Sequence, residues 1–177
     1  MQILILAPLF PPDVGGAAEY VKELAQRLSS HTVTVLIYGH LPESIANVHI
    51  VTVDKRASLP IRLLRYTVAL YNHSKNTDLV IINNGPSTEL PVLLIAIFRP
   101  LQLCLCESDS VAAKASLIGG YGILHRSIIQ RAKIILSFPT DELYRRQEIL
   151  PFGSSNEESE EEREAWWQMH LEKITVV

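Results

Sequence analysis

The first thirty residues combine the elements that constrain the fold most: a short apolar strand, a loop with two glycines, and an amphipathic helix. Residues 2–10 (QILILAPLF) form an apolar run that suits a strand buried on both faces. The loop PPDVGG ends this strand, because proline cannot donate to a sheet ladder and glycine allows tight turns. Apolar residues then recur at helical spacing: Ala18, Val21, Leu24, Ala25 and Leu28. Such a strand–loop–helix unit is where α/β proteins bind anionic groups.

The rest of the chain continues to alternate between strand and helix patterns. Further strands are predicted at 32–38, 48–53, 78–83, 101–106, 133–137 and 173–177, with helices at 59–72, 87–97, 121–132 and 140–150. This alternation predicts an α/β fold: a doubly wound, mostly parallel, Rossmann-like sheet of about seven strands with helices on both faces. Right-handed crossovers favour the strand order 3-2-1-4 and onward, with ligands at the carboxyl ends of the strands.

Length and composition predict one domain over residues 1–177. Residues 157–164 hold six Glu and one Arg, so 151–167 is predicted to be an acidic mobile loop or an exposed helix start. Trp166 and Trp167 either anchor this loop to the domain or form a surface for a partner. The net charge of −3 argues against a nucleic-acid partner.

Targeting signals and redox chemistry point to one compartment. No apolar run reaches the roughly 18 residues of a membrane span, and the N-terminus shows no signal-peptide pattern. Cys104 and Cys106 are interpreted as small core residues in a reducing compartment. We therefore expect a cytoplasmic protein, either free or peripheral at the inner face of a membrane.

The opening motif resembles a known family. The strand, the PPxxGG loop, the helix and the second strand His31-Thr32-Val33-Thr34-Val35 are similar to the start of GT-B glycosyltransferases of the family 4 type, and residues 171–177 (LEKITVV) resemble that domain's closing strand. The resemblance implies the N-terminal, acceptor-binding half of a retaining enzyme that transfers a sugar from a nucleotide-sugar. It implies no cofactor, and a donor-binding glycosyltransferase domain or subunit, not recognised in this sequence, as the partner.

Two glycines, Gly15 and Gly16, are the first candidate ligand-binding residues. The resemblance places them near the diphosphate of the donor and the acceptor, and the alternative is a purely structural turn. Family members commonly carry an acidic residue where this chain has Ala18, with Glu19 one position later. The absence of G-x-G-x-x-G and Walker motifs argues against a dehydrogenase and a P-loop enzyme.

Two turns that follow predicted strands supply the remaining candidates in the crevice. Asn83, Asn84 and Gly85 are candidates for binding acceptor hydroxyls, or they form a turn. Glu107, Ser108 and Asp109 either bind ligand, hold Mg²⁺ through a diphosphate, or cap the next helix. Family members place a histidine near Cys106 or Glu107, so Glu107 is the candidate acid or base. No metal site is expected, because the histidines lack ligand spacing.

Residues 55–77 contain no acidic residue, and basic residues interleave with apolar ones. Arg56, Arg62 and Arg65 are therefore candidates for a surface that contacts an anionic membrane or its acceptor lipid, as in some members of the family. The alternative is a helix that covers the sheet while its arginines extend to solvent. Two other hypotheses for the whole chain remain: a non-catalytic interaction module that kept the fold, and an unrelated flavodoxin-like or nucleotide-binding protein.

Overall fold

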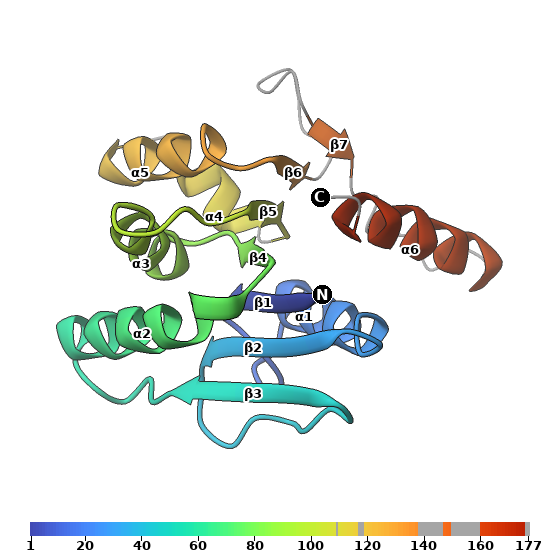
Figure 1. Cartoon of the computed structure of the whole chain (residues 1–177), viewed down its shortest axis with the longest axis horizontal. Helices are drawn as coiled ribbons and strands as arrows, with labels where there is room; N and C mark the ends of the chain where they lie inside the picture. The colour runs from blue at the N-terminus through green and yellow to red at the C-terminus, as the bar shows by residue number, and fades with distance from the viewer. Residues whose placement is uncertain (109, 117–118, 138–146, 150–159, 176–177) are drawn as a thin grey trace.

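A parallel α/β sheet organises the computed structural model, which describes residues 1–108, 110–116, 119–137, 147–149 and 160–175 (Figure 1). Six strands of four to seven residues and one of three residues form the sheet. They are β1 (Gln2–Ala7), β2 (Thr32–Tyr38), β3 (Val48–Val53), β4 (Leu79–Asn83), β5 (Leu103–Glu107), β6 (Ile134–Ser137) and the short β7 (Gln147–Ile149). The helices are α1 (Gly16–Arg27), α2 (Leu59–His73), α3 (Pro86–Ala96), α4 (Ser110–Ala115), α5 (Gly119–Ile129) and α6 (Glu160–Thr175).

The strand order is β3-β2-β1-β4-β5-β6-β7, and every neighbouring pair is parallel. This confirms the predicted α/β class and the predicted order. Strand β1 lies at the centre, where Ile5 is in register with Val35 of β2 and Ile81 of β4. The order reverses between β1 and β4, and the crevice at the carboxyl ends of these strands is the usual ligand site of such a sheet.

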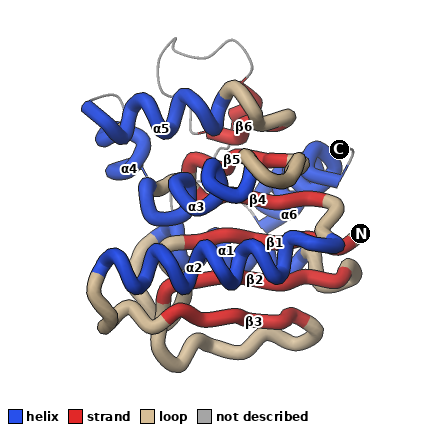
Figure 2. Tube along the Cα trace, turned by 60° about the vertical axis from the view of Figure 1, so that its left-hand side comes forward, coloured by secondary structure: helices blue, strands red, loops and turns tan. Residues whose placement is uncertain are grey.

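Helices cover both faces of the sheet (Figure 2). On one face, α1 and α6 bury their apolar residues against alternate positions of β1, β2 and β4. On the other face, α2, α3 and α5 pack on the remaining positions, with Tyr66, Leu70, Val92, Ile95 and Ile128 in the core. The residues predicted to form the buried stripe of the first helix are all buried. The period-2 alternation of side chains thus builds two separate cores on one sheet.

The C-terminal part of the chain differs from its prediction. Residues 173–175, predicted as a strand, end helix α6. Residues 160–167, predicted as a mobile loop or an exposed helix start, begin this helix, which agrees with the second alternative. The physical reason is helical spacing: Trp167, His170 and Ile174 all lie on one face and are buried on the sheet. Residues 151–159 and 176–177 lie outside the described residues.

Contacts between α6 and α1 hold this helix in place. Trp167 is 1% exposed and stacks on Tyr20 at 5.7 Å between ring centroids. Arg27 lies 4.9 Å from the Trp167 ring and forms an ion pair with Glu164. Trp167 therefore anchors its segment to the domain, which is one of the two roles predicted for the tryptophan pair.

Three further observations complete the comparison with the sequence. The predicted helix at 140–150 is wrong at 147–149, which form strand β7, and its other residues lie outside the described part. Cys104 and Cys106 are both buried and free, which agrees with their interpretation as core residues. Within the described residues, no helix combines the length and apolar character needed to cross a membrane.

Candidate functional site

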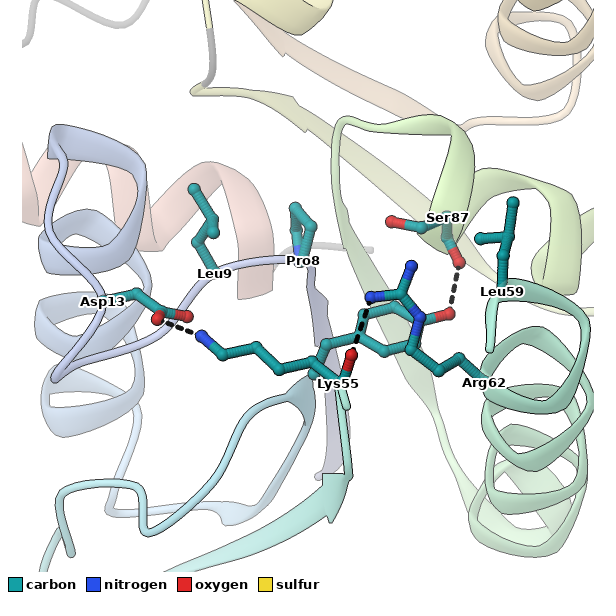
Figure 3. Close-up of a pocket in the computed structure, with 8 residues that line it drawn as sticks. Pro8, Leu9, Asp13, Lys55, Leu59, Arg62 and Ser87 are labelled. Carbon is teal, nitrogen blue, oxygen red and sulfur yellow. Dashed lines mark hydrogen bonds and ion pairs between the residues drawn. The ribbon is translucent and has the colours of Figure 1, made fainter. Parts of the chain in front are cut away.

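A pocket of about 210 Å³ opens at the carboxyl ends of β1, β2 and β3 (Figure 3). Three connections build it: the β1–α1 loop, the β3–α2 loop with the start of α2, and the start of α3. The described residues that line it are Pro8, Leu9, Asp13, Tyr38, Lys55, Leu59, Arg62 and Ser87. The sequence brings these segments together because parallel strands end at the same edge of a sheet, so that their following loops meet there.

Two cations, Lys55 and Arg62, reach into this pocket from different elements. Lys55 forms an ion pair with Asp13 of the β1–α1 loop, which is the one acidic residue among the described residues of the lining. The Arg62 guanidinium donates from Nη1 to the carbonyl of Lys55 at 3.1 Å. Its Nε is buried and has no hydrogen-bond partner among the described residues. The lining is therefore electropositive by one charge and retains an unused donor.

Tyr38 and Ser87 also line the pocket and are hydrogen-bonded to each other. The Tyr38 hydroxyl donates to the carbonyl of Ser87 at 2.9 Å, and the Arg62 guanidinium lies 6.0 Å from the centre of the Tyr38 ring. Burial raises the pKa of the Tyr38 phenol, so that it keeps its proton. The hydroxyl thus ties the end of β2 to the first turn of α3, and the ring supports the guanidinium.

The two glycines of the β1–α1 loop lie next to this pocket in sequence but are not among its lining residues. Gly15 is the N-cap of α1 with φ of 144°, a conformation that side chains rarely adopt, and Gly16 is the first helical residue. A Cβ built on either glycine meets no described atom within 4 Å. The backbone at the start of α1 is therefore open to approach by a ligand.

The β4–α3 turn is buried. Asn83 and Asn84 are both almost fully buried, and the backbone N–H of Asn84 donates to the carbonyl of Cys106 at 3.0 Å. Ser108 donates from its hydroxyl to Oδ1 of Asn83. Gly85 is the N-cap of α3 with φ of 152°. These contacts favour the turn interpretation of Asn83 and Asn84, since the Asn83 side chain and the Asn84 backbone are both bonded inside the domain.

Glu107, the candidate acid or base, belongs to a buried polar cluster with Glu89 and His125. Nε2 of His125 lies 2.7 Å from Glu107 Oε1, and Nδ1 lies 3.0 Å from Glu89 Oε1. Glu89 Oε1 also accepts hydrogen bonds from the Tyr121 hydroxyl at 2.8 Å and from the N–H of Gly85 at 3.0 Å. We refer to Glu89, Glu107, Tyr121 and His125 as the Glu–His–Glu cluster.

The geometry of this cluster sets the charge on His125. Each ring nitrogen faces a carboxylate oxygen, so both nitrogens act as donors and the ring is cationic. Burial lowers the pKa of His125, but the hydrogen bonds and charges of Glu107 and Glu89 outweigh it and raise the pKa to about 9. Glu107 is thus held as a hydrogen-bond acceptor at the end of β5, and a role as acid or base remains a prediction.

Sequence reasoning did not single out Glu89, Tyr121 or His125 as partners. One signal was available: Glu89 is the charged residue in an otherwise uncharged helix, and Tyr121 and His125 share a helical face at i, i+4 spacing. What the sequence lacked was any indication that these two helix faces meet. Asp109, another predicted site residue, lies outside the described residues.

The three arginines predicted as one surface fall in three different environments. Arg62 lines the pocket, whereas Arg56 pairs with Asp54 at 3.1 Å and lowers the pKa of that carboxyl to about 2. Arg65 is exposed on the outer side of α2. The structure therefore separates an inward arginine from the two at the surface.

The remaining observations concern metals and known proteins. Within the described residues, no group of three or more His, Cys, Asp or Glu side chains is arranged to hold a metal ion. Comparison of the chain with protein families and with curated proteins gave no match.

Proposed function

We propose that this chain is the acceptor-binding half of a retaining glycosyltransferase that transfers a sugar from a nucleotide-sugar, and that a second, donor-binding domain or subunit completes the site. The observation that carries the proposal is the basic pocket at the carboxyl ends of β1–β3, beside the open glycine loop. A Rossmann-like sheet places substrates at this edge. The resemblance of the PPxxGG loop and the His31–Val35 strand to family 4 enzymes supplies the reaction class.

The test is a ligand screen on the purified chain, with and without a donor-binding glycosyltransferase domain. Thermal shift and titration would use UDP-, GDP- and TDP-sugars as donors and polyprenyl-phosphate-like acceptors. We expect binding or turnover that requires both halves. Tight association of the two proteins without a ligand response in any combination would contradict catalysis and favour a module that kept only the fold.

A variant of the glycine loop tests whether the loop belongs to the site. Gly16→Val adds bulk where no described atom lies within 4 Å, so the fold should persist while ligand approach to the backbone is blocked. The matched control is Gly120→Val in the first turn of α5, where a Cβ also meets no described atom within 4 Å. Equal ligand affinity in both variants would remove the loop from the site.

The outer side of α2 supports a second part of the proposal, peripheral contact with an anionic membrane. Leu64 is 65% exposed and Val68 is 51% exposed, with Arg65 beside them and no acidic residue from 55 to 77. Apolar residues with flanking cations are the composition of an interfacial helix. Sedimentation with anionic vesicles should carry the chain down, and Leu64→Ser with Val68→Ser should release it. Equal sedimentation of the double variant would exclude this face.

A further inference from the structure

We propose that the pocket recognises a phosphoryl group on the acceptor, held by the guanidinium of Arg62 and the ammonium of Lys55. That the bound molecule is the acceptor rests on the proposed function. That the bound group is a phosphoryl group rests on the pocket alone. The sequence predicted that Arg62, with Arg56 and Arg65, contacts an anionic membrane or its acceptor lipid. The structure places Arg62 in the pocket together with Lys55, which was not a candidate.

Arg62 and Lys55 supply hydrogen-bond donors to the pocket. A guanidinium carries five N–H donors in a planar fork that matches phosphate oxygens. Nη1 of Arg62 is used by the Lys55 carbonyl, while Nε is buried without a partner among the described residues. Figure 3 shows Arg62 beside Ser87 and Pro8, and Lys55 extending across the same hollow towards Asp13. Two donor groups thus approach one volume, Lys55 from the β3–α2 loop and Arg62 from the first turns of α2.

The charges that line the pocket favour an anionic ligand. Lys55 and Arg62 face a single carboxylate, that of Asp13, among the lining residues that the structure describes. The lining carries a net charge of +1, so a phosphoryl group in its monoanionic form would leave lining and ligand together neutral, and the dianion would leave a net charge of −1. A neutral sugar hydroxyl would leave the positive charge uncompensated. Ser87 lies in the first turn of α3, whose N-terminal end adds partial positive charge on the same side.

The volume of the pocket limits the size of the group that it can hold. About 210 Å³ is below the range of roughly 300–1,000 Å³ that holds a whole drug-sized ligand. The pocket therefore suits a small charged group with the remainder of its molecule outside. Leu59 lines the pocket and is 55% exposed, so it connects the cations to the exposed apolar residues of α2. A phosphoryl group borne by a soluble ester or by a lipid fits this arrangement.

The experiment measures binding to the full chain with two kinds of probe. Calorimetric titration with inorganic phosphate and glycerol phosphate represents a soluble source. Phosphatidylcholine vesicles that contain phosphatidic acid represent a lipid source, compared with vesicles of equal charge made with phosphatidylglycerol. Binding in both arms supports the proposal with the phosphoryl group as the determinant, and binding only to phosphatidic acid supports it with a lipid as the source.

Variants identify the residues. Arg62→Gln and Lys55→Gln should each weaken binding by about tenfold or more, because a charge-assisted hydrogen bond is lost. Asp13→Asn should tighten binding severalfold, because it frees Lys55 from its ion pair. The matched control is Arg131→Gln, which removes an exposed arginine between α5 and β6 and should leave the affinity unchanged. Circular dichroism reports whether each variant is folded, and Asp13→Asn carries the test if the others are not.

Two results would overturn the assignment. One is equal weakening by Arg62→Gln and Arg131→Gln, which would mean a diffuse effect of net charge. The other is no phosphate-dependent binding in either arm. The two proposals can fail independently. If the chain and its donor half glycosylate a phosphate-free acceptor and Arg62→Gln has no effect, the transferase proposal stands and the phosphoryl assignment is lost; if phosphate binds through Arg62 but no transfer occurs with any donor half, the transferase proposal is lost and the phosphoryl assignment stands.

Discussion

Two buried histidines on opposite faces of the sheet show how differently this domain treats the same side chain. His125 of α5 is 0% exposed and lies between two carboxylates, 2.7 Å from Glu107 and 3.0 Å from Glu89. His170 of α6 is 3% exposed and lies among aromatic rings, stacked on Trp166 at 5.0 Å between centroids. Its Nε2 forms a 2.7 Å hydrogen bond with the Tyr20 hydroxyl.

The difference teaches that surroundings, more than depth, set the charge of a buried group. Two acceptors hold His125 as a cation with a pKa of about 9 despite burial. Burial, with a smaller contribution from Lys173, lowers the pKa of His170 to about 4 and keeps it neutral. The cation fastens α5 and α3 to the end of β5. The neutral ring fastens α6 to α1.

Of the changes to the two histidines, removal of the His125 cation should lower the stability most. We expect His125→Gln to lower the free energy of unfolding by about 3–5 kcal/mol, because two buried carboxylates lose their shared counter-charge. Urea unfolding at pH 7 measures this. His40→Gln, at an exposed position, is the control and should be neutral. A loss below about 1 kcal/mol for His125→Gln would mean that the cluster contributes no net stability.

Alkaline pH should break the same cluster without a mutation. The pKa of His125 is raised from 6.5 to about 9 in the folded state, so its contribution is complete below pH 6.5 and is lost as pH rises through 9. The shift corresponds to about 3 kcal/mol of unfolding free energy. Urea titrations at pH 6.5 to 9 in wild type and His125→Gln measure it. Parallel pH profiles would contradict the assigned charge.

Acid should act on the other histidine, with the opposite sign. The pKa of His170 is lowered from 6.5 to about 4 when the chain folds, so the unfolded state binds the proton more readily as pH falls below 6.5. Between pH 7 and 5 this should cost wild type about 2 kcal/mol relative to His170→Phe, which cannot take up the proton. Carboxylates titrate in both proteins, so only the difference between the two curves is informative. Coincident curves would mean that His170 is not neutral in the fold.

The sequence predicted the scaffold better than the site, for a physical reason. Strand order and the buried stripe of α1 follow from local periodicity and from the handedness of crossovers, and both are confirmed. Residues 173–177 (KITVV) include β-branched residues and were predicted as a strand. Their described part is helical because Trp167, His170 and Ile174 gain more by packing as one helical face. Tertiary burial overrode local preference.

The site depends on contacts between residues distant in the chain. Glu89 and His125 are separated by 36 positions, and Asp13 and Lys55 by 42. No local pattern reveals that these groups meet, although the predicted strand order already placed their loops at one edge of the sheet. Arg62 is an example. The sequence pattern placed it on a basic amphipathic helix, and the structure shows that it lines the pocket.

The smallest expected effect isolates the hydrogen bond of the neutral histidine. At pH 7, His170→Phe keeps an aromatic ring beside Trp166 and loses the bond to the Tyr20 hydroxyl, so we expect a loss of about 1 kcal/mol in unfolding free energy. Tyr20→Phe removes the same bond from the other side and also a 3.4 Å contact with Cys106 Sγ. The double variant should therefore cost less than the sum of the two single losses. Full additivity would mean that the bond contributes nothing, and that packing and the ion pairs of Arg27 with Glu164 and of Arg163 with Glu23 hold α6 on α1.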